Sequence, residues 1–313
     1  MESYFFSASE IGQILSVVPQ RITQLKDSLS IPDDETVIKG KYRFYKPSAT
    51  KRIFEHRGVN YSGKEIMCFA NNKGGVGKSS ISVTAAKIMA AAGFKVLLID
   101  ADPQANSTSY LYDKNFKNVL CNVVNRDCSL RDAIVAVDEN LDLLPSSLEN
   151  SRADLYLAKT NANPINYFKK QLAELNYNYI VWDLSPSLSM SNFYAILSCD
   201  RVVIVSTLKE FSIQGVQMTH NIIEEARASF DYTPKVSILI NEYDSRLGNN
   251  LSNMNRLASF GIELESVAIK KDNKMDRSQS ERVALNKNSI AYKDIASFVF
   301  SMTGIQKAQK SIQ

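Results

Sequence analysis

The sequence predicts an α/β protein with a doubly wound, mainly parallel sheet and a smaller domain in front of it. Two observations lead to this fold class. From residue 65 onward, short apolar runs alternate with helical segments, whereas residues 1–60 are helical, then rich in basic and aromatic side chains. We therefore expect an N-terminal domain over residues 1–60, a linker over 61–64 and the larger domain over 65–313.

The strands of the larger domain are predicted from six short, continuous apolar runs. Such runs are typical of parallel strands that are covered on both faces. Helical segments lie between most of them, as the crossover connections of parallel strands require, and a closing amphipathic helix is expected at residues 290–303. The six runs are residues 65–70, 96–99, 141–144, 179–182, 202–205 and 236–240.

Composition limits the class of protein. The chain has 313 residues, 44% hydrophobic and 22% charged, with a net charge of +4. No run approaches the roughly 18 apolar residues of a membrane span, and the N-terminus lacks the pattern of a secretory signal. The four scattered cysteines contain no C-x-x-C pair, which favours buried thiols over metal ligands or disulfides. We expect a cytoplasmic protein.

Residues 1–28 have the pattern of two short helices joined by a tight turn. Ser7 and Glu10 have the spacing of a capping box, and Pro19 begins a second helix. Ile22 and Leu25 would face inward. The residues that then face outward, and suit base edges and phosphates, are Gln20, Arg21, Thr23 and Gln24.

The stretch after these helices combines basic and aromatic residues. Between Val37 and Arg57 there are seven basic residues and one acid, and Gly40 suits the tip of a hairpin over residues 37–45. Lys41 and Arg43 on this hairpin are candidate DNA contacts, although a small helical cap with solvated charges is an alternative. The arrangement resembles the winged helix-turn-helix of the MerR type, which implies binding to operator DNA.

The stretch Lys73-Gly-Gly-Val-Gly-Lys-Ser-Ser80 lies between an apolar run and a helical segment. Glycines there let successive backbone N–H groups point into one concavity at a helix N-terminus, which is a phosphate-binding arrangement. Lys78 adds a full positive charge, and Ser79 is placed to give its hydroxyl to Mg²⁺. A turn without a ligand is the alternative. The expected nucleotide-binding residues are Lys73, Gly74, Gly75, Val76, Gly77, Lys78, Ser79 and Ser80.

Carboxylates follow two of the apolar runs. Asp100 and Asp102 come after residues 96–99, and Asp183 comes after residues 179–182. An aspartate that ends a strand beside a phosphate loop usually holds Mg²⁺, directly or through water. The alternative is that these aspartates only cap the loops that follow.

Together these motifs resemble the ParA/MinD ATPases over about residues 65–300. The stretch 73–80 looks like their deviant Walker A box, with Lys73 as the extra lysine, and residues 100–106 look like the Walker A′ box of the ParA branch. Residues 183–187 look like the Walker B box, although Leu184 and Ser185 depart from the usual small residue followed by Pro or Ala.

The resemblance implies a role for each matching residue. Lys78 and the loop amides would hold the ATP phosphates, with Mg²⁺ on Ser79 and Asp183. Lys73 would reach the ATP of a second subunit, in an ATP-dependent homodimer. Asp102 would orient the attacking water and Asp100 would make metal or switch contacts, or the two roles would be exchanged. The position that would contact adenine is Asn241.

Basic residues near the C-terminus are candidates for sequence-independent DNA binding. By themselves they would indicate a solvated face, but the resemblance favours DNA, with binding that weakens steeply as salt rises. These residues are Arg246, Lys270, Lys271, Lys274 and Arg277.

As a whole, the resemblance implies a bacterial, nucleoid-associated DNA-partition ATPase. A ParB-type centromere-binding protein would stimulate slow ATP hydrolysis, and the N-terminal domain would repress the protein's own operon. A transcriptional repressor that responds to nucleotide is the main alternative. A MinD-like membrane ATPase is disfavoured by the polar tail 306–313, and a nitrogenase-type iron protein by the lack of suitably placed cysteines.

Overall fold

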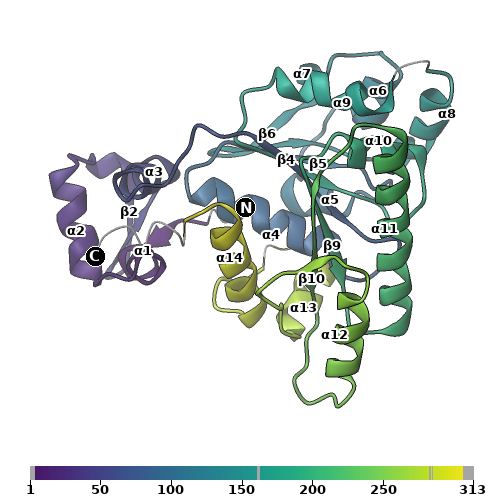
Figure 1. Ribbon diagram of the computed structural model, residues 1–313. Helices are drawn as coiled ribbons and strands as arrows, with labels where there is room; N and C mark the ends of the chain where they lie inside the picture. The colour runs from purple at the N-terminus through teal and green to yellow at the C-terminus, as the bar shows by residue number, and fades with distance from the viewer. Residues whose placement is uncertain (1–3, 161–162, 282, 284, 306–313) are drawn as a thin grey trace.

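The computed structural model describes residues 4–160, 163–281, 283 and 285–305, and the tail 306–313 lies outside these residues. Figure 1 shows a small N-terminal unit on one side of a larger α/β unit. Among the described residues, no helix has the length and apolar character needed to cross a membrane.

The larger unit is built on an eight-stranded sheet with the order β11-β10-β9-β4-β8-β5-β7-β6. All neighbouring strands are parallel except β6 and β7. The six apolar runs are all strands, which confirms the mainly parallel α/β prediction; β6 and β11 were not predicted. The strands are β4 (Glu65–Ala70), β5 (Val96–Asp100), β6 (Val135–Asp138), β7 (Leu141–Leu144), β8 (Tyr179–Asp183), β9 (Arg201–Ser206), β10 (Lys235–Ile240) and β11 (Glu263–Leu264).

Helices cover both faces of this sheet. Alternate residues of β4 belong to two separate hydrophobic clusters: Met67 and Phe69 to one, Ile66 and Cys68 to the other. The helices are α4 (Lys78–Ala91), α5 (Asn106–Leu111), α6 (Leu120–Val124), α7 (Leu130–Ala133), the 3₁₀ helix η2 (Leu148–Arg152), α8 (Ala153–Leu157), α9 (Pro164–Ala173), α10 (Met190–Leu197), α11 (Glu210–Ser229), α12 (Asn250–Ala258), α13 (Asn273–Glu281) and α14 (Ile290–Met302).

The N-terminal unit contains the predicted helices and hairpin. Ser7 and Glu10 form the capping box of the first helix, Ile22 and Leu25 are buried, and Gly40 has φ +61° at the hairpin tip. A short strand that was not predicted joins the hairpin to give the order β1-β3-β2. The elements are β1 (Phe6–Ser7), α1 (Ala8–Leu15), α2 (Pro19–Ser28), the 3₁₀ helix η1 (Asp33–Glu35), β2 (Thr36–Lys39), β3 (Tyr42–Tyr45) and α3 (Pro47–His56).

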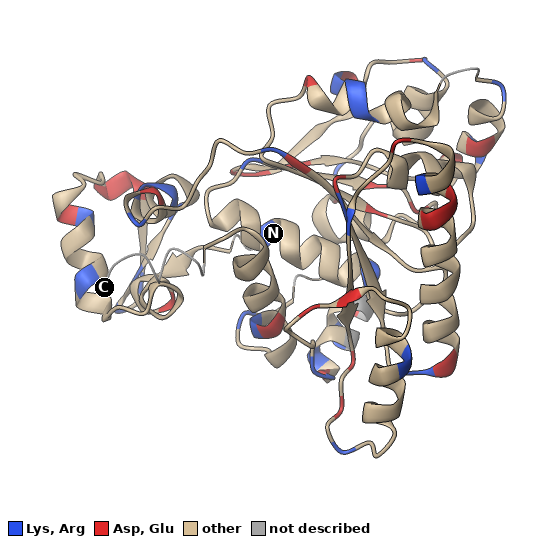
Figure 2. Ribbon diagram, in the orientation of Figure 1, with Lys and Arg blue, Asp and Glu red and all other residues tan. Residues whose placement is uncertain are grey.

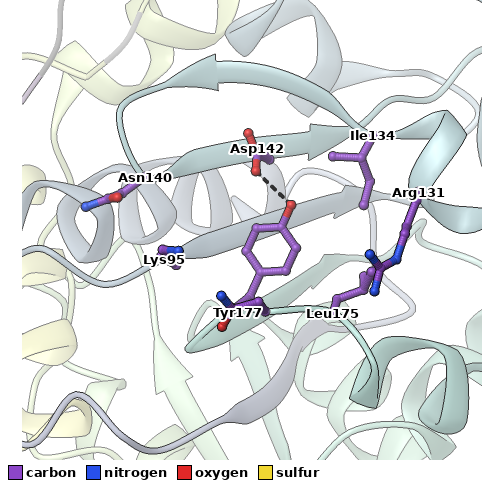
Figure 3. A pocket seen from close by; sticks show the side chains of 8 residues that line it. Lys95, Arg131, Ile134, Asn140, Asp142, Leu175 and Tyr177 are labelled. Carbon is purple, nitrogen blue, oxygen red and sulfur yellow. Dashed lines mark hydrogen bonds between the residues drawn. The ribbon is translucent and has the colours of Figure 1, made fainter.

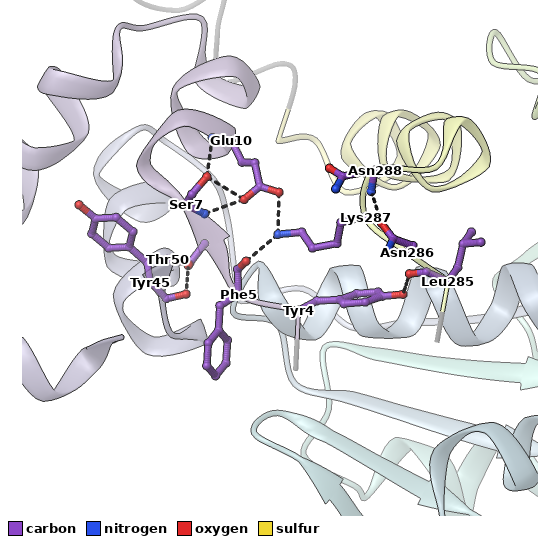
Figure 4. A network of polar contacts seen from close by, with 10 residues as sticks. All are labelled: Tyr4, Phe5, Ser7, Glu10, Tyr45, Thr50, Leu285, Asn286, Lys287 and Asn288. Carbon is purple, nitrogen blue, oxygen red and sulfur yellow. Dashed lines mark hydrogen bonds and ion pairs between the residues drawn. The ribbon is translucent and has the colours of Figure 1, made fainter. Parts of the chain in front are cut away.

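The two units are packed together by polar and aromatic contacts. Figure 4 shows Lys287, in the loop before α14, reaching the N-terminal unit. Its Nζ lies 2.6 Å from Glu10 Oε1 and donates to the Phe5 carbonyl oxygen at 2.6 Å. The ring of Phe6 lies edge-on to that of Phe300, with centroids 6.1 Å apart. Tyr61, in the predicted linker, is buried and stacks on Phe94 at 4.3 Å. One hydrophobic cluster therefore runs through both units.

Candidate nucleotide-binding site

The glycine-rich loop connects β4 to the N-terminus of α4, as the sequence predicted. Gly75 and Gly77 have positive φ angles of +74° and +94°, which glycine adopts without steric cost. A Cβ at Gly77 would lie 2.3 Å from Nδ2 of Asn241, and this nitrogen donates to the Val76 carbonyl oxygen at 2.8 Å. Asn241, predicted to contact adenine, therefore also holds the loop from the end of β10.

The two lysines of the loop lie in different surroundings. Lys78 is buried, and its Nζ donates to the Lys73 carbonyl oxygen at 3.2 Å. Burial lowers the pKa of Lys78, while the charges of Asp183 and Asp102 act in the opposite direction. The side chain of Lys73 is exposed to solvent. One cation is thus held inside the site and the other at its edge.

Asp100 and Asp183 lie side by side at the ends of neighbouring strands β5 and β8. Both are fully buried. Burial, and then the charge of Asp183, raise the pKa of Asp100 well above its usual value. Burial also raises the pKa of Asp183, although the nearby hydroxyls of Ser107 and Ser79 and the charge of Lys78 act against this. The two carboxylates therefore resist being ionised together.

The surroundings of Asp183 fit a magnesium ion. Its Oδ2 accepts a hydrogen bond from Ser107 Oγ at 2.6 Å, but its Oδ1 is buried without a hydrogen-bond partner among the described residues. The Ser79 hydroxyl lies next to this carboxylate. Carboxylate and hydroxyl oxygens are hard ligands, which suit Mg²⁺ when water and phosphate oxygens complete the octahedron. Ser79 and Asp183 are thus the residues that would hold the ion.

Asp100 and Asp102 differ in how their oxygens are used. Asp100 Oδ2 accepts from the Thr108 N–H and hydroxyl, both at 2.8 Å, and Oδ1 accepts from the Asp102 N–H at 3.1 Å. Asp102 Oδ1 accepts from the Gln104 N–H at 2.9 Å, and the charge of Asp102 acts on Lys78. Both oxygens of Asp100 thus accept hydrogen bonds from its own loop and from Thr108, whereas Asp102 accepts from the next loop residue and acts through its charge on Lys78. Which of the two aspartates orients a water molecule stays a prediction.

Sequence reasoning missed several side chains that support these groups. Ser107 and Thr108 hold the two buried aspartates and lie just beyond the matched stretch 100–106. Asn71 accepts a hydrogen bond from the Lys73 N–H at 2.8 Å. Its position between a strand and the glycine-rich loop was a signal that could have identified it.

The DNA-binding candidates of the N-terminal unit lie on its surface. Gln20, Arg21, Thr23 and Gln24 on α2 are exposed, as is Lys41 beside the hairpin tip. Arg43 is half-buried, and its Nη1 lies 3.4 Å from Asp33 Oδ1 in an ion pair.

The candidates near the C-terminus are brought together in part. One pocket is lined by four of them, Arg246, Lys270, Lys271 and Lys274. The fifth, Arg277 on α13, forms an ion pair with Glu281, with Nε 2.7 Å from Oε1. Two cations that line the pocket form ion pairs with nearby carboxylates. Arg246 Nη2 lies 2.6 Å from Asp244 Oδ2, and Lys270 Nζ lies 3.8 Å from Asp294 Oδ1. Figure 2 accordingly shows basic and acidic segments close together in this region.

A separate pocket lies at the other end of the parallel strands, away from the glycine-rich loop. Figure 3 shows Tyr177 donating its hydroxyl hydrogen to Asp142 Oδ2 at 2.7 Å, with Lys95 and Arg131 on either side. These residues lie near the amino ends of β5, β7 and β8, whereas the glycine-rich loop follows the carboxyl end of β4. This pocket contains none of the predicted site residues.

Fold and site together define a class of protein. A parallel sheet leads through a glycine-rich loop into a helix that carries Lys78 and Ser79, and an aspartate ends the strand next to β4. These are the parts of a P-loop nucleotide-binding protein.

Comparison with known proteins identifies the family. The model of the family described as "AAA domain" matches residues 64–238, more than half of the chain. The chain therefore belongs to this family, and within it to the P-loop ATPases of the ParA/MinD type. The sporulation initiation inhibitor protein Soj of Bacillus subtilis is 31% identical over 163 residues, which are 51% of this chain and 64% of Soj.

Solved structures share the fold. The complex of a Cyanothece McdA variant with ATP matches with a TM-score of 0.70 at 18% identity, over 78% of this chain and 97% of that chain. A putative plasmid partition protein from Borrelia burgdorferi B31 bound to AMPPNP matches with a TM-score of 0.63 at 25% identity, over 76% of this chain and 99% of that chain. The N-terminal unit extends beyond the segment matched by the family model.

Proposed function

We propose that the protein is an ATP-dependent DNA segregation ATPase whose ATP-bound form is a homodimer. The observation that carries this proposal is the pair of lysines in the glycine-rich loop. Lys78 is buried against its own site, whereas Lys73 extends into solvent from a loop whose backbone is fixed. An exposed cation at the rim of a phosphate site suits the nucleotide of a second copy. The relationship to a partition protein and to Soj supports this interpretation.

Within one subunit, the proposed chemistry divides among few groups. Lys78 and the backbone amides of residues 74–80 hold the phosphates, and Ser79 and Asp183 hold Mg²⁺, which neutralises charge on the phosphate oxygens. Asp102 orients the attacking water, and Asp100 fixes the loop that carries Asp102. Lys73 of the second copy stabilises charge on the transferred phosphoryl group only after docking, so hydrolysis depends on dimerisation.

Two surfaces would bind DNA in this proposal. The pocket lined by Arg246, Lys270, Lys271 and Lys274, together with Arg277, binds DNA of any sequence through phosphates. Helix α2 and the hairpin β2–β3 form a winged helix-turn-helix that binds operator DNA. A ParB-type centromere-binding protein stimulates hydrolysis and release. The protein would act on the nucleoid in the bacterial cytoplasm.

The test is DNA binding by the purified protein with ATP, ADP or no nucleotide. Random-sequence DNA and the region upstream of the protein's own gene are compared, with Lys73→Ala alongside. We expect ATP to switch on salt-sensitive binding to random DNA, and Lys73→Ala to abolish that binding. Random-DNA binding that is independent of nucleotide, or unaffected by Lys73→Ala, would refute the proposed mechanism.

A second candidate function is a transcriptional repressor that uses nucleotide as a conformational ligand. The exposed polar face of α2 beside the hairpin favours it, because this surface is suited to sequence-specific readout. In the same experiment a repressor would bind only the upstream DNA, whichever nucleotide is present.

A further inference from the structure

Asn71 connects the glycine-rich loop to a distant part of the chain. It follows β4 directly and is 2% exposed. Its Oδ1 accepts from the Lys73 N–H at 2.8 Å, and its Nδ2 donates to the carbonyl oxygens of Val205, at 2.8 Å, and Ser212, at 3.3 Å. Val205 lies in β9 and Ser212 in the first turn of α11, so one side chain ties the loop to both elements.

The acceptors of Asn71 are themselves held in place. The Ser212 hydroxyl lies 3.0 Å from that of Ser206 and accepts from the Thr207 N–H at 3.0 Å. The start of α11 is therefore bound to the end of β9, and Asn71 hydrogen-bonds to both. All these side chains are buried, where hydrogen bonds are well defined and costly to leave unmade.

Gly215 on α11 allows Asn71 to occupy this position. A Cβ at Gly215 would lie 2.1 Å from Asn71 Oδ1 and 3.3 Å from the Lys73 backbone nitrogen. A glycine inside a helix is less favourable than an alanine, because it loses more backbone freedom on folding. This glycine lies inside a helix of 20 residues, and the close approach of Asn71 gives a reason for its presence there.

The backbone of Lys73 is consequently held on both sides of its Cα. Its N–H donates to Asn71, and its carbonyl oxygen accepts from Lys78 Nζ at 3.2 Å. The side chain starts from this fixed point and extends into solvent. A long, flexible lysine can reach a target on another molecule efficiently only if its backbone is placed beforehand.

We propose that Asn71 is the positioning residue for Lys73, and that Gly215 is glycine so that Asn71 can reach the loop. The inference rests on the proposed function for the use of Lys73, but the contact itself does not. If Asn71 positions Lys73, then the junction of β9 and α11, which holds Asn71, also controls ATP-dependent dimerisation.

The test compares Asn71→Ala, Gly215→Ala, Lys73→Ala and the double variant Asn71→Ala/Lys73→Ala, with Gly63→Ala as the control. A Cβ at Gly63 would meet no atom within 4 Å. We expect Asn71→Ala and Gly215→Ala to keep the affinity for a fluorescent ATP analogue within about threefold, and to lower dimer formation with ATP and kcat by about tenfold or more. The double variant should be no worse than Lys73→Ala, because Asn71 acts through Lys73.

A purely structural role for Asn71 gives a different result. It would lower ATP affinity and kcat together, and it would weaken the Lys73→Ala variant further, so that the two losses multiply. Either outcome overturns the inference.

Hydrogen exchange of the Lys73 amide separates this inference from the proposed function. We expect faster exchange in Asn71→Ala and Gly215→Ala than in the wild type and Gly63→Ala. If exchange is faster but Lys73→Ala still dimerises normally, Asn71 does position Lys73 and the proposed use of Lys73 is wrong. Unchanged exchange in both variants overturns the inference whatever Lys73 does.

Discussion

At the scale of single residues, the shape of the phosphate loop depends on Gly77. It combines φ +94° with a close approach to the Asn241 side chain. Gly77→Ala would add backbone strain of about 1–2 kcal/mol and push Asn241 away from the Val76 carbonyl oxygen. We expect affinity for a fluorescent ATP analogue to fall by about 100-fold or more, measured by titration.

Gly75→Ala is the matched control for this prediction. Gly75 has φ +74°, but a Cβ there would meet no atom within 4 Å. Only the strain remains, so the expected loss of affinity is about tenfold. Equal losses for the two variants would show that the contact with Asn241 does not matter.

At Asp183, the charge that is proposed to bind Mg²⁺ should also destabilise the folded protein. Its folded-state pKa is raised above the usual value of an aspartate, so ionising it costs folding free energy, about 1.4 kcal/mol for each unit of difference. That cost is absent below the unfolded-state pKa and grows as pH rises toward the folded-state pKa. Asp183→Asn keeps an acceptor for Ser107 and removes the charge.

We therefore expect Asp183→Asn to unfold at a higher temperature than the wild type at pH 8, by about 2–4 °C for each kcal/mol gained. This difference in unfolding temperature should shrink as pH falls toward about 4. The variant should also lose Mg²⁺-dependent ATP hydrolysis. Thermal unfolding at several pH values, with the exposed Asp34→Asn as control, provides the measurement. A difference that does not change with pH would contradict the argument.

At the scale of elements, the pocket lined by Arg246, Lys270, Lys271 and Lys274 and helix α2 are proposed to bind different kinds of DNA, so variants in each should separate the two activities. Lys271 is exposed and forms no ion pair among the described residues, whereas Lys270 is paired with Asp294. Lys271→Ala should weaken ATP-dependent binding to random DNA and reduce the slope of log K against log salt by about 0.9. Lys270→Ala should have a smaller effect, because Lys270 must give up Asp294 to contact a phosphate.

Arg21→Ala on α2 gives the complementary test. It should weaken binding to the upstream DNA and leave random-DNA binding and its salt dependence unchanged, as measured by fluorescence anisotropy. Loss of both activities in either variant would mean that one surface serves both kinds of DNA.

The elements also show which parts of the structure a sequence can predict. The runs that became β4, β5 and β8 to β10 are continuous and apolar because both faces are covered. Strand β6 is mostly half-exposed, and its register against β7 is irregular between Ala136 and Asp138. Its strand character comes from pairing with a neighbour, which no local pattern records.

The candidate site likewise contains residues that the sequence could identify and contacts that it could not. Lys73 to Ser80 was identified because its residues are contiguous and their spacing carries the chemistry. The contact of Asn71 with Gly215, and that of Ser107 with Asp183, join segments that meet only in the folded chain. The hydrogen bonds that distinguish Asp100 from Asp102 are of the same kind, since they involve Thr108 and loop amides that the spacing of the two aspartates does not reveal.

At the scale of the whole molecule, the N-terminal unit and the ATPase unit share one hydrophobic cluster. Phe6 is 2% exposed and packs against Phe300, while Tyr4 packs edge-on against Tyr292 at 5.1 Å. Two domains joined only by a flexible linker would unfold separately. A continuous core predicts that the chain unfolds in one transition.

Trp182, the single tryptophan, makes this testable. It is fully buried in β8, in the hydrophobic cluster that Phe6 does not join. Phe6→Ala should destabilise the chain by about 3–5 kcal/mol, and the transition seen by Trp182 fluorescence should shift together with the circular dichroism signal of the helices. Phe211→Ala, at an exposed position, is the control.

Phe6→Ala could instead give two unfolding transitions and leave the one seen by Trp182 unchanged. The N-terminal unit would then be energetically independent. Nucleotide binding would then have no route through the shared core to the surface of α2 that is proposed to bind operator DNA.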